Sequence, residues 1–170
     1  MTRHLRMVAL TSAVLFASAL SAGADLAYTQ YINLRYHYAV SYPAAILTPQ
    51  GEPDAGDGQS FLSKGRDVEM SVWGSYNVLD ETIRSRFGDQ TRGKNGASLD
   101  RKVTFKRLAK NWFVVSGSSG ENIFYEKTIL EGNVFITVAF SYPAAAKTSW
   151  DPILATVSKS LQHSRSSAPR

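Results

Sequence analysis

Few residues in this chain combine the types and the spacing that catalysis requires. Beyond the first 24 residues the histidines are His37 and His163, and nothing in the sequence places a serine and an acid beside either of them. Segment 116–120 lacks the residue order of a Gly-x-Ser-x-Gly nucleophile elbow, and the sequence contains no His-Glu-x-x-His motif and no glycine-rich phosphate loop. The chain has no cysteine, which excludes thiol chemistry. We therefore expect no catalytic residue and no cofactor, and a small hydrolase of unknown type is the alternative.

Three acids in one short segment are the candidates for a metal site. Glu52, Asp54 and Asp57 lie in segment 51–58, which is dense in turn-forming residues and has no periodicity, as expected of an exposed loop. Carboxylate oxygens are the ligands that calcium prefers, but the spacing does not match an EF-hand loop. The sequence therefore offers two interpretations, a calcium site and a solvated Asp-Gly turn.

An aromatic and basic surface is the second candidate site. In the predicted strand 68–76, Val68, Met70 and Val72 alternate with Glu69, Ser71 and Trp73, so the second set is expected to point away from the core. Aromatic side chains are common anchors of interfaces, and this face could bind a glycan strand, a peptide or a protein of the cell envelope. The alternative is that the second of the two predicted helices covers the face and makes Trp73 a core residue. The candidate ligand-binding residues are Trp73, Tyr76, Lys102, Lys106, Trp112 and Tyr125.

Short strands with period-2 patterns are expected to position these residues. From Tyr36 the sequence alternates apolar and small residues up to Pro43, which predicts a half-buried strand with His37 inside it. Segments 59–62 and 68–76 predict a hairpin, and Lys102, Thr104 and Lys106 are expected to point outward from a later strand. Four further strands are expected at 101–108, 112–118, 122–130 and 134–142, and their short connections require antiparallel pairing.

Two helices are expected to pack on this sheet. The first is predicted over 78–90 with Asn77 as its N-cap, because Leu79, Ile83 and Phe87 recur every four residues. The second is predicted over 150–163 with Thr148 or Ser149 as its cap, with one apolar stripe facing the sheet. The fold class is therefore α+β, an antiparallel sheet of about six to seven strands with two or more helices packed on it.

The first 24 residues have the three parts of a cleavable signal peptide. Arg3 and Arg6 precede an uncharged, mostly apolar run over residues 7–20, and Ala22-Gly23-Ala24 is a small-x-small cleavage site. The run is shorter than the about 20 apolar residues that span a bilayer, so we expect no stable membrane insertion after cleavage, and an uncleaved anchor is the alternative. The prediction is a signal peptide at 1–24, a single domain at 25–163 and a disordered tail at 164–170, in a periplasmic or secreted protein.

The charge of the chain is modest. The net charge is +5, and removing Arg3 and Arg6 with the leader, which holds no acid, leaves +3. Basic residues between Arg84 and Lys110 are interleaved with polar and apolar ones and form no concentrated basic stripe. We therefore expect no nucleic-acid partner.

The order of these motifs resembles a known family. The run Tyr36–Pro43, the loop 51–58, Val72-Trp73-Gly74, a helix, a four-strand meander and a terminal amphipathic helix are together similar to the PsbP-like fold of small exported bacterial proteins. The resemblance implies an α/β/α sandwich that acts as a binding or assembly module without a shared active site. His37 departs from the pattern, since the fold's strand more often carries a small residue there, and the resemblance implies no metal site.

Overall fold

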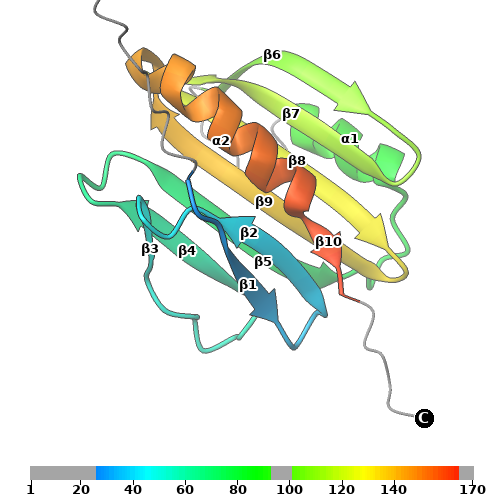
Figure 1. Ribbon diagram of the computed structural model, residues 1–170. Helices are drawn as coiled ribbons and strands as arrows, with labels where there is room; N and C mark the ends of the chain where they lie inside the picture. Colours follow the sequence, from blue (N-terminus) through cyan, green and yellow to red (C-terminus); the bar gives the residue numbers. More distant parts are fainter. Residues whose placement is uncertain (1–25, 93–100, 165–170) are drawn as a thin grey trace, which may run out of the picture.

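A computed structural model describes residues 26–92 and 101–164. The proposed signal peptide, most of the loop after the first helix and the tail beyond Ser164 lie outside the described residues. Figure 1 shows three layers: a large antiparallel sheet in the middle, helix α2 with a small sheet on one face, and helix α1 on the other. The expected α+β class and antiparallel sheet are confirmed. Within the described ranges, no helix is long and apolar enough to cross a bilayer.

The large sheet has seven strands in the order β3-β4-β5-β9-β8-β7-β6. Their bounds are β3 Leu47–Pro49, β4 Gly58–Ser63, β5 Glu69–Tyr76, β6 Arg101–Leu108, β7 Trp112–Ser119, β8 Asn122–Glu131 and β9 Val134–Pro143. Every neighbouring pair is antiparallel, so the predicted hairpin and four-strand meander are confirmed. The pairing of β5 with β9 joins these two units into one sheet.

A second, small sheet was not predicted. It consists of β1 Thr29–Asn33, β2 Tyr38–Tyr42 and β10 Gln162–His163, with β2 in the middle. The strand expected from Tyr36 begins only at Tyr38, because the chain reverses over 34–37 to pair β2 with β1. His37 therefore lies in a turn, with a φ of 51°, and not inside a strand.

Helix α1, Ile83–Thr91, begins five residues later than expected. Its N-cap is Thr82, whose hydroxyl accepts the Ser85 backbone N–H at 3.0 Å. Asn77 closes a separate turn, since its Oδ1 accepts the Glu81 N–H at 2.8 Å. Leu79 is consequently 78% exposed and takes no part in the expected apolar stripe.

Helix α2, Lys147–Ser160, begins earlier and ends earlier than expected. A 3-10 turn, η1 Ala144–Ala146, leads directly into it, so neither Thr148 nor Ser149 is the cap. The chain leaves the helix after Ser160 because Gln162 pairs with β2 as part of β10. The predicted apolar stripe is confirmed, with Leu154, Val157 and Leu161 buried.

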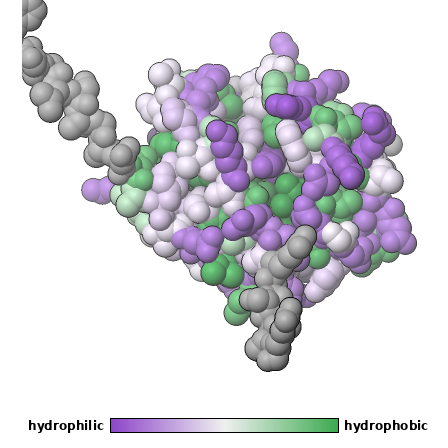
Figure 2. Space-filling model, turned by 45° about the vertical axis from the view of Figure 1, so that its right-hand side comes forward, coloured by the Kyte–Doolittle hydropathy of each residue, from purple (hydrophilic) through white to green (hydrophobic). Residues whose placement is uncertain are grey.

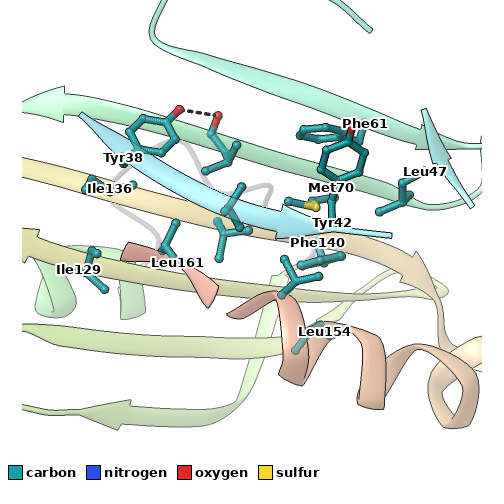
Figure 3. Packing of buried hydrophobic residues seen from close by; sticks show 14 of the residues in the cluster. Tyr38, Tyr42, Leu47, Phe61, Met70, Ile129, Ile136, Phe140, Leu154 and Leu161 are labelled. Carbon is teal, nitrogen blue, oxygen red and sulfur yellow. Dashed lines mark hydrogen bonds between the residues drawn. The ribbon is translucent and has the colours of Figure 1, made fainter. Parts of the chain in front are cut away.

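The main core lies between the large sheet and the layer of α2 and the small sheet. Tyr38, Phe61, Met70 and Ile136 have no exposed surface in it. Figure 3 shows how these side chains converge from both layers, with the Tyr38 hydroxyl donating to the Val72 carbonyl at 3.4 Å. A smaller cluster on the opposite face holds α1 against the sheet, and it comprises Ile83, Phe113, Val115, Phe124 and Phe135.

Candidate functional site

The two faces of the large sheet differ in what covers them. The covered face carries Met70, Val72, Ile136, Val138 and Phe140 and lies under α2 and the small sheet. The open face carries the residues between them, because successive side chains of a strand point to opposite faces of the sheet. Of the described elements α1 packs on the open face, where it contacts β6 and β7.

Trp73 lies on the open face, as the alternation in β5 predicts. It pairs with Thr137 of β9, while its neighbour Val72 is buried on the covered face. Helix α2 lies across the opposite face, so the alternative in which this helix buries Trp73 is wrong. The side chain is 37% exposed, which leaves part of the indole ring available to a ligand.

The six predicted ligand-binding residues do not share one face. Lys102 pairs with Ser118 and Lys106 with Val115, two β7 residues on opposite faces. A bulge between Val103 and Phe105 causes this, because one extra residue reverses the side on which the following side chains point. The register places Lys106 with Trp73 on the open face. It places Tyr76, Lys102, Trp112 and Tyr125 on the covered face.

On the covered face, Trp112 and Tyr125 pack beside the main core. The Tyr125 hydroxyl is 2.7 Å from the Ser158 hydroxyl, and Lys127 donates to the Ser158 carbonyl at 2.6 Å while lying over the Trp112 ring. Burial raises the pKa of Tyr125 and lowers the pKa of Lys127. These contacts attach α2 to β8, so Trp112 and Tyr125 have a structural role here.

The acidic loop does not gather its carboxylates. Glu52 accepts the Tyr31 hydroxyl at 2.6 Å, and burial together with this carboxylate raises the Tyr31 pKa to about 12. Asp57 contributes its backbone carbonyl to Tyr38 at 3.0 Å, and Asp54 is exposed. In the part of the chain that the structure describes, no group of three or more His, Asp or Glu side chains could hold a metal ion. The loop therefore presents no preformed calcium cage.

A hollow lies beside Trp73 on the open face. It has a volume of about 370 Å³, within the range of small-molecule sites. We call it the Trp73 hollow, and its lining is Trp73, Ser75, Arg86, Gln90, Arg101, Phe113, Glu126, Thr128, Phe135 and Thr137. Trp73 also lines two neighbouring hollows, one along β5, β8 and β9 and one beside the acidic loop. This side chain is the point at which the three depressions meet.

A charged cluster forms one wall of the Trp73 hollow. Glu126 of β8 accepts Arg101 of β6 at 2.6 Å through one oxygen, and Gln90 of α1 donates to the other. The Arg101 guanidinium lies 3.7 Å from the centroid of the Phe124 ring, which it covers. Arg101 reaches Glu126 across β7, because the open face of β7 between them carries the small residues Gly117 and Ser119. Glu126 is therefore engaged on both oxygens.

Arg86 of α1 supplies a second guanidinium to the same hollow. Its Nε lies 3.4 Å from a carboxylate oxygen of Glu81, and its guanidinium carbon lies 4.4 Å from the centroid of Phe135. These two contacts hold the planar group in the lining of the hollow, and the ion pair uses Nε and not the terminal nitrogens. An arginine held in this way is ready to donate to an acceptor without further ordering.

A pair of threonine hydroxyls lies on the sheet side of the hollow. The Thr128 and Thr137 hydroxyl oxygens are 2.8 Å apart, and both residues are buried. One hydroxyl donates to the other, so the pair retains one O–H that it does not itself use. This proton adds another donor to the lining.

Most of this lining was not predicted. Trp73 alone was among the candidates, whereas Arg86, Arg101 and Glu126 come from α1, β6 and β8 and meet only when α1 packs on the sheet. One signal was present in the sequence: Glu126 lies in the middle of a predicted central strand, where a charge requires a partner.

The comparisons with known proteins support the fold. No protein-family model matches the sequence, and no curated protein matches it. The solution structure of cyanobacterial PsbP (CyanoP) from Synechocystis sp. PCC 6803 matches with a TM-score of 0.61 at 14% identity, covering 86% of this chain and 98% of that one. A crystal structure from Bacteroides thetaiotaomicron VPI-5482 matches with a TM-score of 0.47 at 11% identity, covering 83% of this chain and half of that one. The match to the PsbP structure shows that the chain has a PsbP-like fold.

Proposed function

We propose that this PsbP-like chain is an exported, non-catalytic binding module of the cell envelope, and that the Trp73 hollow is its ligand site. The features of a cleavable leader in residues 1–24 support export. The ligand is a peptide, a glycan or an envelope protein that presents a matching group.

One observation carries the proposal: a large aromatic ring is left partly exposed where three hollows meet, on a sheet face opposite the main core. A tryptophan offers a wide, rigid contact area at a low entropic penalty, which is why it often anchors ligands and partners. On the side of the molecule turned forward in Figure 2, hydrophilic and hydrophobic residues are interspersed and the hydrophobic areas are small. Among the described residues, that side therefore shows no broad apolar patch that would serve as an alternative interface.

The small cell-envelope hydrolase is the second candidate and has less support. Hydrolysis by a serine requires a nucleophile in hydrogen-bond reach of a base, and Ser75 is the serine in the lining of the hollow. The described histidines are elsewhere: the His37 and His163 rings lie 6.5 Å apart at the small sheet, and neither lines this hollow. The polar groups that do line it are two guanidinium groups, an amide, hydroxyls and one engaged carboxylate, an arrangement suited to holding a ligand.

The test compares two exposed aromatics on opposite faces. Wild type, Trp73→Ala and the control Phe105→Ala, whose ring is 52% exposed on the covered face, are each incubated with envelope extract. Bound small molecules, glycans and proteins are then quantified by mass spectrometry. We expect at least tenfold lower recovery of one species with Trp73→Ala and unchanged recovery with Phe105→Ala. Equal recovery by all three proteins, each shown to be folded by its melting curve, would refute the proposal.

The export part has its own measurement. Amino-terminal sequencing of the protein isolated from its native compartment should begin at Asp25, the residue after the proposed cleavage site. A chain that retains Met1 or the apolar run in the isolated protein would contradict it.

A further inference from the structure

We infer that the Trp73 hollow binds a carboxylate carried on a ring, so that the acid contacts Arg86 while a face of the ring lies against Trp73. The inference rests on the proposed function, because it names the ligand class for the same site. The charge, the donor inventory and the shape of the hollow support it independently.

The charge of the lining favours an anion. Among the described residues that line the hollow, Arg86 and Arg101 are cationic and Glu126 is the acid. Glu126 pairs with Arg101 at 2.6 Å, and Glu81, which lies outside the lining, contacts Arg86 through Nε at 3.4 Å, so the terminal N–H groups of Arg86 are the charged donors left to bind an anion. The planar guanidinium suits a carboxylate, which it can bind through two parallel hydrogen bonds.

The hydrogen-bond inventory also favours an acceptor-rich ligand. Each Glu126 oxygen already accepts one hydrogen bond, from Arg101 and Gln90, which reduces the capacity of this acid to accept a ligand's protons. The threonine pair retains one unused O–H, and Arg86 retains its terminal N–H groups. A neutral polyol would bring as many donors as acceptors, whereas a carboxylate brings acceptors alone.

The shape of the site favours a ligand that carries a ring. Trp73 provides a partly exposed indole beside a hollow of about 370 Å³, which is large enough for one ring with its substituents. Flat or ring-shaped groups gain dispersion and hydrophobic contact on such a surface. Two sources share this chemistry, a hexuronic acid of a glycan and an aromatic carboxylate, and the experiment separates them.

The experiment is calorimetric titration of the full protein with three probes: glucuronate, glucose and benzoate. Glucose lacks only the acid of glucuronate, so this pair isolates the carboxylate. We expect at least tenfold tighter binding of glucuronate or benzoate than of glucose, and weaker binding as salt is raised. Tighter binding of glucuronate than of benzoate identifies the glycan source, and the reverse order identifies the aromatic source.

Variants on one helix provide the matched control. Arg86→Gln should weaken binding of the preferred acid at least tenfold, and Arg86→Lys, which keeps the charge without the planar fork, should weaken it less. Arg84→Gln removes the same charge two residues away, at an exposed position outside the lining, and should leave binding unchanged. Melting curves establish that each variant is folded.

Failure of this inference can be distinguished from failure of the proposed function. If glucose binds as tightly as glucuronate and benzoate, or if Arg86→Gln binds the acid like wild type, the ligand class is wrong. If neither acid binds while wild type retains an envelope species that Trp73→Ala loses, the class is again wrong and the binding module stands. If no acid binds and no species depends on Trp73, both are wrong.

Discussion

The covered and open faces of the large sheet are made by the same strands and have different compositions. In β9, Ile136, Val138 and Phe140 lie on the covered face and are buried. The alternate residues on the open face become small from Thr137 onward, with Ala139 and Ser141 following. One strand therefore contributes to a core on one side and to a site on the other.

The side chains on each face match the layer that packs on that face. Large apolar side chains stabilise the fold only when a second layer excludes water from them. On the covered face, α2 and the small sheet form that layer. Small residues leave room above the sheet, and the space next to them can hold the long side chains of Arg86 and Arg101. The Trp73 hollow lies on a part of the open face that α1 and the other described elements do not cover.

The largest expected effect comes from a cavity on the covered face. Ile136→Ala removes a fully buried side chain from the main core, and we expect it to lower the free energy of unfolding by about 2–5 kcal/mol. Urea unfolding followed by circular dichroism measures this. The matched change on the open face of the same strand is Ser141→Ala, for which we expect a change within about 0.5 kcal/mol. Similar losses from both variants would remove the distinction between the two faces.

A smaller effect is expected from the threonine pair beneath the Trp73 hollow. Thr128→Val or Thr137→Val alone breaks a 2.8 Å hydrogen bond between two buried hydroxyls, and each should cost about 1 kcal/mol of unfolding free energy. The double variant replaces both hydroxyls with methyl groups of similar shape and should be no less stable than either single one. A double-mutant cycle measures the coupling. Strictly additive losses would mean that the two hydroxyls do not act as a pair.

The meander was predictable because its signals are local. Strands β6 to β9 alternate clearly and are joined by short turns, so their bounds were predicted to within one residue. The small sheet was missed because β10 has two residues, and because it pairs with a strand more than 120 positions earlier, as in Gln162 with Ala39. Length and sequence separation, more than composition, set this limit.

For the site, the period of two in β5 predicted that Trp73 points away from the core. The sequence did not predict the hollow beside it. The bulge between Val103 and Phe105 has no glycine or proline to mark it, and it moved Lys106 to the opposite face from Lys102. Arg86 meets Glu126 and Arg101 only through the angle at which α1 rests on β6 and β7, which depends on packing. Side-chain direction within one strand is local information, whereas convergence of three elements is tertiary information.

The smallest effect at neutral pH belongs to a hydroxyl at the edge of the covered face. Tyr142 donates to Asp151 of α2 at 3.1 Å, and burial together with this carboxylate raises its pKa from about 10 to about 12. Between pH 10 and 12 the folded protein therefore keeps a proton that the unfolded chain has lost, and the free energy of unfolding must fall as the pH rises. Tyr142→Phe has no proton to lose, so its stability should decline less steeply over that range than that of wild type, while at pH 7 the two should differ only by the lost hydrogen bond. Urea titrations at pH 7, 10, 11 and 12 measure both slopes, and parallel slopes would show that the covered face does not shield this hydroxyl from solvent.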